Sequence, residues 1–162
     1  MNEWNNYSGL EKLGSAKAAA GAAAMMCAMQ KRTVSLLAYY DAACKAGAYA
    51  GMFHAIERRP YPLYYSFLAF NELYKMKNEV ENTIDTDEIR ICAAADENHA
   101  AILIANEREE NYDLSFALKN LRGGELRAYL IDSDHMLTET TFAPAMTIGP
   151  NSVLLITNTI NT

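Results

Sequence analysis

The feature that most constrains this chain is a change in sequence character near residue 80. Before it, helix-forming residues and aromatics occur in long runs, whereas after it short β-rich runs alternate with turn residues. The change predicts two folding regions, 1–80 and 81–162. With 162 residues, of which 51% are hydrophobic, the chain can bury one sizeable core or two small ones.

The first region begins with an alanine-rich segment that predicts a helix. Ser8 or Ser15 is a suitable N-cap, and the helix is expected to run to about Arg32, where basic residues favour the negative end of the helix dipole. The following run, Thr33 to Tyr40, is mostly apolar with a β-branched start, which predicts a strand buried on both faces. A loop is expected from Asp41 to Arg59.

A second helix is predicted to begin at Pro60 or Pro62, because proline is tolerated in the first turn of a helix. Apolar side chains then recur at spacings of four, three and four residues, at Leu63, Phe67, Phe70 and Tyr74. This spacing predicts one apolar stripe that packs against the rest of the protein.

The second region contains six runs that alternate as strands do, with turn residues between them. The predicted strands are Glu88 to Ala94, Ala100 to Asn106, Tyr112 to Leu118, Glu125 to Asp132, Met136 to Phe142, and Ser152 to Thr157. Short antiparallel strands at this spacing favour a β-sandwich. The expected fold class is therefore α+β.

Charge and composition exclude several classes of function. A net charge of −6 and a pI near 5.0 argue against a nucleic acid or an anionic membrane as partner, whereas a neutral sugar remains compatible. The apolar stretch from Ala18 to Met29 is too short to span a bilayer and lacks a short basic leader, so no export signal is expected. Three scattered cysteines, Cys27, Cys44 and Cys92, favour a reduced, cytoplasmic location.

No metal or cofactor is expected. His54, His99 and His135 lie in separate predicted elements without the spacing of a metal site, and glycine-rich phosphate loops are not found.

Several short motifs occur in a fixed order: Asn2-Glu3-Trp4-Asn5, the alanine helix, Tyr39-Tyr40-Asp41, Gly51-Met52-Phe53, the aromatic helix and the β-rich region. This order resembles the C-terminal part of retaining glycoside hydrolases of the family 39 type, which includes β-xylosidases; α-L-arabinofuranosidases are built similarly. The resemblance implies a partial (β/α) barrel of two strands and two main helices, followed by an antiparallel β-sandwich. A complete barrel needs about 250 residues, so the chain is expected to be a fragment.

The resemblance also implies roles for single residues. Glu3 would be the catalytic nucleophile, and its acid/base partner would lie upstream of Met1. Trp4, Asn5, Tyr39, Tyr40 and Asp41 would bind substrate. The alternative is that Glu3 is a solvated terminal residue, the tyrosines are rim residues, and Asp41 caps a turn. Without the second carboxyl group, the chain alone is expected to show no appreciable glycosidase activity.

The sequence departs from the family pattern in the loop after Asp41. Ala43-Cys44, Ala50 and His54 stand where family members commonly have Arg-Pro, Asn and Asp. These losses of polar groups imply an unusual specificity or a reduced activity for a full-length parent.

The sequence leaves two rival functions open. The chain could be a non-catalytic carbohydrate-binding or protein-interaction module, although Trp4 is its only tryptophan and lies outside the predicted sandwich. Alternatively, it is one piece of an assembly, in which a second copy or a partner chain covers the open barrel edge. Homo-oligomerisation is expected, because large exposed apolar patches usually recruit a partner.

Overall fold

The computed structural model describes residues 3–5, 14–42, 51–83, 88–121 and 123–159. Two helices and nine strands follow one another in the described part of the chain: β1 (Glu3–Trp4), α1 (Ala16–Gln30), β2 (Ala38–Tyr39), α2 (Pro62–Met76), β3 (Arg90–Ala95), β4 (Ala100–Asn106), β5 (Tyr112–Ser115), β6 (Arg127–Ile131), β7 (Met136–Thr140), β8 (Ala145–Ile148) and β9 (Ser152–Thr157).

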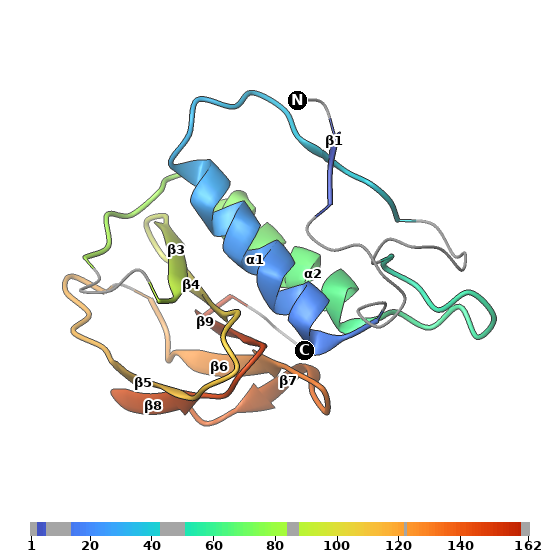
Figure 1. The fold of residues 1–162 in the computed structure, drawn as a ribbon. Coiled ribbons are helices and arrows are strands. Elements are labelled where there is room, and N and C mark those ends of the chain that lie inside the picture. The colour runs from blue at the N-terminus through green and yellow to red at the C-terminus, as the bar shows by residue number, and fades with distance from the viewer. Residues whose placement is uncertain (1–2, 6–13, 43–50, 84–87, 122, 160–162) are drawn as a thin grey trace.

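These elements form four layers (Figure 1). A parallel pair, β1–β2, lies on one side of the two helices, and a five-stranded antiparallel sheet lies on the other. An antiparallel pair, β5–β8, covers the far face of that sheet. The fold is therefore α+β, a barrel end of two strands and two helices followed by an antiparallel β-sandwich, as the sequence predicted.

Helix α1 begins where one of the two candidate caps predicted. The Ser15 hydroxyl oxygen accepts a hydrogen bond from the Ala18 N–H at 3.1 Å, which satisfies one of the free donors of the first turn. The helix ends at Gln30, close to the expected Arg32, and Lys31 is its C-cap. Ser8 lies outside the described residues.

The alanines of α1 allow it to be buried on two sides. Ala19, Ala23 and Cys27 face the five-stranded sheet, whereas Ala18 and Ala22 face the β1–β2 pair. Small side chains let neighbouring backbones approach closely. Helix α2 approaches so closely that the buried Ser66 hydroxyl donates a hydrogen bond to the Ala19 carbonyl at 3.1 Å.

Helix α2 has its first turn at Pro62, as predicted, but its apolar stripe is shorter than expected. Leu63, Phe67 and Phe70 pack against the β1–β2 layer. Tyr74, on the same side one turn further, is 75% exposed, so its assignment to the buried stripe is wrong. The α2 side chains that pack against the β1–β2 layer end at Phe70, one turn before Tyr74.

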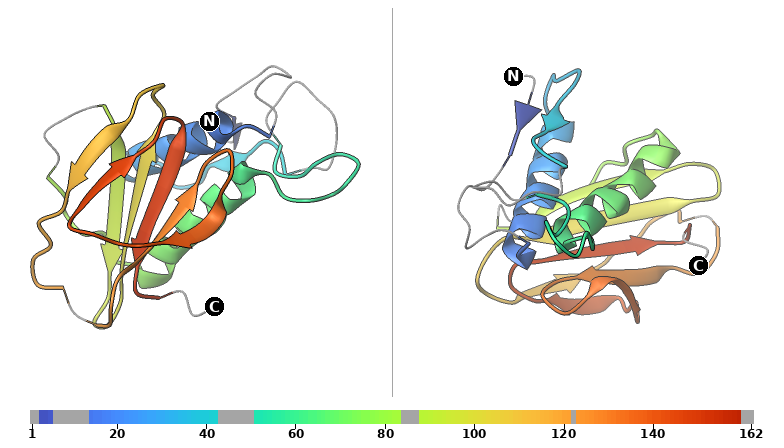
Figure 2. Two further views of the ribbon diagram at one scale, coloured as in Figure 1. Left: turned by 90° about the horizontal axis from the view of Figure 1, so that it is seen from below. Right: turned by 90° about the vertical axis from the view of Figure 1, so that its right-hand side faces the viewer.

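The five-stranded sheet has the order β3-β4-β9-β6-β7, and four of its strands, β3, β4, β9 and β6, alternate between two cores. On β4, for example, Leu103 faces the helices, whereas Ile104 faces the β5–β8 pair. The central strand β9 is buried along its whole length. Figure 2 shows the helices lying across one face of this sheet.

The strand predictions in the second region are close to the structure, with shifts of one or two residues at the ends of β3, β6 and β7 and two larger differences. Strand β5 ends at Ser115 rather than Leu118, because its partner β8 is only four residues long. Strand β8 itself lies in a segment that the sequence did not predict as a strand. It forms because the Ala145–Ile148 backbone pairs with β5, and Ile148 fills the second core.

The predicted strand from Thr33 to Tyr40 is wrong in extent and in burial. Only Ala38–Tyr39 forms a strand, and Val34 and Leu36 are 46% and 78% exposed. Within the described residues, its only strand partner is the two-residue β1. A strand without neighbours on both sides has nothing to bury its apolar residues.

The two predicted regions are joined directly. The Val80 N–H donates to the Ala93 carbonyl at 2.9 Å, and the Ala95 N–H donates to the Asn78 carbonyl at 3.0 Å. The segment after α2 therefore runs beside β3, while the boundary at residues 80–81 stays a prediction. In the part of the chain that the structure describes, neither helix is long and apolar enough to cross a membrane.

Candidate functional site

The candidate site begins with the parallel pairing of β1 and β2. Glu3 is opposite Ala38, and Trp4 is opposite Tyr39. Successive side chains of a strand point to opposite faces. Trp4 is buried against the helices, so the exposed Glu3 lies on the face away from them. In a (β/α) barrel that face is the interior of the barrel, and its C-terminal end holds the active site.

Trp4 is anchored by two other aromatic rings. Its ring centroid lies 4.9 Å from that of Tyr39 in an edge-to-face arrangement and 6.2 Å from that of Phe67 in a stacked one. The residue is only 8% exposed. The structure thus gives Trp4 a packing role at the base of the site, and its predicted stacking on a sugar stays a prediction.

Asn5 ties the ends of the two strands together. Its side-chain nitrogen donates to the Tyr39 hydroxyl at 2.9 Å and also to the Tyr40 carbonyl. The Tyr40 N–H in turn donates to the Trp4 carbonyl at 2.8 Å. These contacts join residues that are far apart in sequence and fix the backbone beside Glu3.

The phenol of Tyr39 is held in its neutral form. Burial raises the pKa of Tyr39 above its ordinary value, and the nearby Asp41 carboxylate raises this pKa further, while the hydrogen bond from Asn5 opposes the shift. A neutral phenol is a suitable partner for a sugar hydroxyl because it can both donate and accept.

The structure therefore brings the six predicted site residues to one end of the β1–β2 pair. Glu3 and Tyr40 are exposed there, and Asp41 follows at the end of β2. The sequence did not predict the direct packing of Trp4 on Tyr39. The two-residue alternation would have indicated it, since Glu3 and Trp4 cannot both face a substrate on the same side.

An apolar groove of about 380 Å³ lies beside this site. It runs between the C-terminal part of α1, the segment before β2, and α2, and it reaches Trp4. Its apolar lining includes Met26, Met29, Leu36, Leu37, Phe67 and Phe70.

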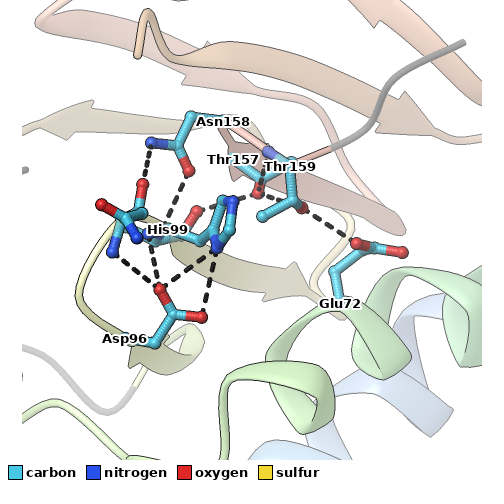
Figure 3. Close-up of polar contacts among 8 residues, drawn as sticks. Glu72, Asp96, His99, Thr157, Asn158 and Thr159 are labelled. Atoms are coloured by element: carbon cyan, nitrogen blue, oxygen red, sulfur yellow. Dashed lines mark hydrogen bonds and ion pairs between the residues drawn. The ribbon is translucent and has the colours of Figure 1, made fainter. Parts of the chain in front are cut away.

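The polar residues at the other end of the protein are explained by structure alone (Figure 3). In the turn between β3 and β4, an Asp96 carboxylate oxygen accepts hydrogen bonds from the Asn98 and His99 N–H groups, each at 2.8 Å. At the end of β9, the Thr159 hydroxyl donates to Glu72 of α2 at 2.9 Å. These contacts fasten the turn and α2 to the sheet.

No group of three or more His, Cys, Asp or Glu side chains within the described ranges is placed to hold a metal ion. Of the loop residues that depart from the family pattern, His54 accepts a hydrogen bond from the Glu57 N–H at 3.0 Å. Ala43, Cys44 and Ala50 lie outside the described residues.

Comparison with known proteins identifies the fold. No family model and no curated protein matches this chain. Among solved structures, a glycoside hydrolase family 30 subfamily 8 xylanase from Clostridium acetobutylicum is similar, with a TM-score of 0.74 and 13% sequence identity over 97% of this chain. A family 30 endoxylanase from Clostridium papyrosolvens C71 matches with a TM-score of 0.68 and 12% identity over 97% of this chain.

An arabinose-bound family 51 α-L-arabinofuranosidase is also similar, with a TM-score of 0.66 and 14% identity over 90% of this chain. The matches include the barrel end and the sandwich together, because they cover nearly the whole chain. This chain spans 41% and 40% of the two xylanases and 28% of the arabinofuranosidase. At these identities the comparison shows a shared fold.

Proposed function

We propose that this chain carries the nucleophile-bearing end of a retaining glycoside hydrolase. The observation that carries the proposal is the position of Glu3, exposed on the face of β1 away from the helices and beside a parallel strand. A carboxylate at that position of a (β/α) barrel faces the substrate. The fold shared with xylanases and an arabinofuranosidase supports this assignment.

The chemistry assigned to Glu3 is attack on the anomeric carbon. In a retaining enzyme the nucleophile forms a covalent glycosyl-enzyme intermediate, while a second carboxyl group protonates the leaving oxygen and then activates water. The two groups must lie about 5 to 5.5 Å apart. We assign the second group to polypeptide outside this sequence, on a neighbouring strand of the completed barrel.

The other site residues would position the sugar. Tyr40 and Asp41 supply a phenol and a carboxylate at the end of β2, and Asn5 holds the Tyr39 hydroxyl and the Tyr40 backbone carbonyl. Trp4 supports the end of the β1–β2 pair from the helix side through its ring contact with Tyr39. Hydrogen bonds of this kind hold a substrate in the geometry that the nucleophile requires.

The proposed substrate is a pentose-containing glycoside, and the proposed family is the family 39 type. The ordered motifs from Asn2 to Phe53 support the family. Similarity of fold to xylanases and to an arabinofuranosidase supports the sugar class.

The same proposal includes a partner. The apolar groove beside Trp4 and the exposed Val34 and Leu36 form a surface suited to further barrel units. A second copy of this chain or another polypeptide would cover it. Light scattering at micromolar concentration should then detect a species larger than one chain, and Leu36→Asp should shift it towards the monomer. A strictly monomeric unsubstituted chain would contradict the proposed partner.

Activity tests the catalytic part. We expect no release of nitrophenol from aryl α-L-arabinofuranoside or aryl β-xyloside by the chain alone. A polypeptide that supplies the remaining barrel units, joined in frame or co-expressed, should give release, and Glu3→Gln should abolish it. Glu139→Gln, on an exposed position of β7, is the matched control and should leave the rate unchanged. Release by the chain alone that Glu3→Gln abolishes would show that it contains a complete site.

A further inference from the structure

Two thiols meet in the core between the helices and the five-stranded sheet. Cys27 lies on α1 and Cys92 on β3, and both side chains belong to the same buried cluster. Their exposed fractions are 2% and 5%, and both are reduced in this structure. They are hydrogen-bonded to each other, so two elements that are far apart in sequence place two sulfur atoms side by side.

The pair is electrostatically asymmetric. The hydrogen bond from Cys27 lowers the pKa of the Cys92 thiol, and the Lys31 ammonium lowers it further, against the effects of burial and the Glu79 carboxylate. The same hydrogen bond and burial raise the pKa of Cys27. Cys92 is therefore the better thiolate and nucleophile, and Cys27 is the thiol that donates to it.

We propose that Cys27 and Cys92 are a peroxide-oxidisable pair that forms a disulfide between α1 and β3. The Cys92 thiolate attacks one oxygen of the peroxide, the O–O bond breaks, and Cys92 becomes a sulfenic acid. The Cys27 sulfur then attacks the Cys92 sulfur, and the S–OH oxygen leaves as water. In total, two thiols and one hydrogen peroxide give one disulfide and two waters.

The position of the bond determines what it would do. Helix α1 lies between the β1–β2 pair and the five-stranded sheet, and its two ends lead to β1 and β2. A disulfide at Cys27 would fasten the barrel end to the sandwich covalently. This inference does not depend on the proposed glycosidase activity, because neither cysteine belongs to the Glu3 site.

Thiol counting after oxidation tests the pair. In a Cys44→Ser background, the folded protein is treated with hydrogen peroxide, unfolded, and labelled with a maleimide. We expect both remaining thiols to be lost together, with dithiothreitol restoring them, and peptide mapping to find a Cys27–Cys92 link. The melting temperature should rise by roughly 10 °C, because the cross-link closes a long loop.

Single variants distinguish the pair from general oxidation. In Cys27→Ser, peroxide should still oxidise Cys92, without a cross-link and without the rise in melting temperature. Peptide mapping is repeated on wild-type protein, so that the cross-link is also tested in a chain whose folding no substitution has changed. Two labelled thiols after treatment, or sulfinic and sulfonic acids without the link, would overturn the proposal.

Discussion

The five-stranded sheet and the β1–β2 pair lie on opposite faces of the same two helices, and their surroundings differ sharply. The sheet is covered by helices on one face and by β5–β8 on the other. The β1–β2 pair is covered only on its helix side, and beyond it lie the exposed Glu3 and an apolar groove. One region is packed on both faces, whereas the other is covered on one face only within the described residues.

Two leucines show what this difference teaches. Leu155 on β9 is fully buried, whereas Leu36 before β2 is 78% exposed. Both lie in apolar runs that predict a buried strand from sequence. Whether such a run is buried therefore depends on its neighbours in the fold, which a local sequence pattern does not contain.

The largest expected effect separates these two leucines. Leu155→Ala should lower the free energy of unfolding by about 2–5 kcal/mol, because it removes buried methyl groups and leaves a cavity. Measured on the monomer, at a concentration below that of self-association, Leu36→Ala is the matched control and should change this free energy by no more than about 0.5 kcal/mol. Urea denaturation followed by circular dichroism measures both. Equal losses would mean that Leu36 is buried in solution and would break the comparison.

Two asparagines provide the next test. Asn106 is fully buried, and its side-chain nitrogen donates to the Glu110 carbonyl at 2.8 Å and to the Gly149 carbonyl at 2.7 Å. Its replacement by alanine leaves both carbonyls without this donor and should cost about 2–3 kcal/mol. Asn5→Ala removes contacts at a partly exposed position and should cost about 1 kcal/mol or less.

The same denaturation measurement compares these asparagine variants. A larger loss of unfolding free energy for Asn5→Ala than for Asn106→Ala would show that the β1–β2 contacts stabilise the fold more than the sandwich contacts do. This result would contradict the comparison.

The smallest effect concerns pH and the β1–β2 pair. Burial raises the folded-state pKa of Tyr39 above the unfolded value of about 10. The resulting stability is complete below the unfolded pKa and is lost as the pH rises towards the folded pKa, because only the unfolded phenol ionises easily. By pH 11 the loss should be about 1 kcal/mol after allowance for solvent screening.

The measurement is the free energy of unfolding between pH 8 and about 11. Tyr39→Phe should remove this part of the stability loss at alkaline pH. Tyr74→Phe changes a side chain that is 75% exposed and should leave the stability loss unchanged. If both variants retain the full slope, the Tyr39 phenol is accessible to solvent in the folded protein.

Local rules predicted most of the sandwich and both helices. Ser15 and Pro62 were recognised at the starts of the helices because capping and first-turn chemistry is local. Strand β8 could not be recognised, because its four residues between Pro144 and Gly149 acquire strand geometry only by pairing with β5. The pairing partner lies about thirty residues earlier in the chain, beyond the range of any local pattern.

The roles of the candidate site residues stay predictions, although the structure brings these residues together. Motif order singled out Glu3 and Tyr39, but the packing of Trp4 against the helices follows from strand alternation in three dimensions. The buried contact between Cys27 and Cys92 left no signal in their spacing. Cytoplasmic location, inferred from the scattered cysteines, stays a prediction.

The central claim is that Glu3 is the nucleophile of a completed retaining site, and chemical rescue tests it most directly. The chain completed by a polypeptide that supplies the remaining barrel units should lose activity in Glu3→Gly. Azide added to an aryl pentoside should restore nitrophenol release and give a glycosyl azide of inverted anomeric configuration, because azide replaces the missing carboxylate on its own face. A glycosyl azide of retained configuration, or full activity in Glu3→Gly without azide, would contradict the claim.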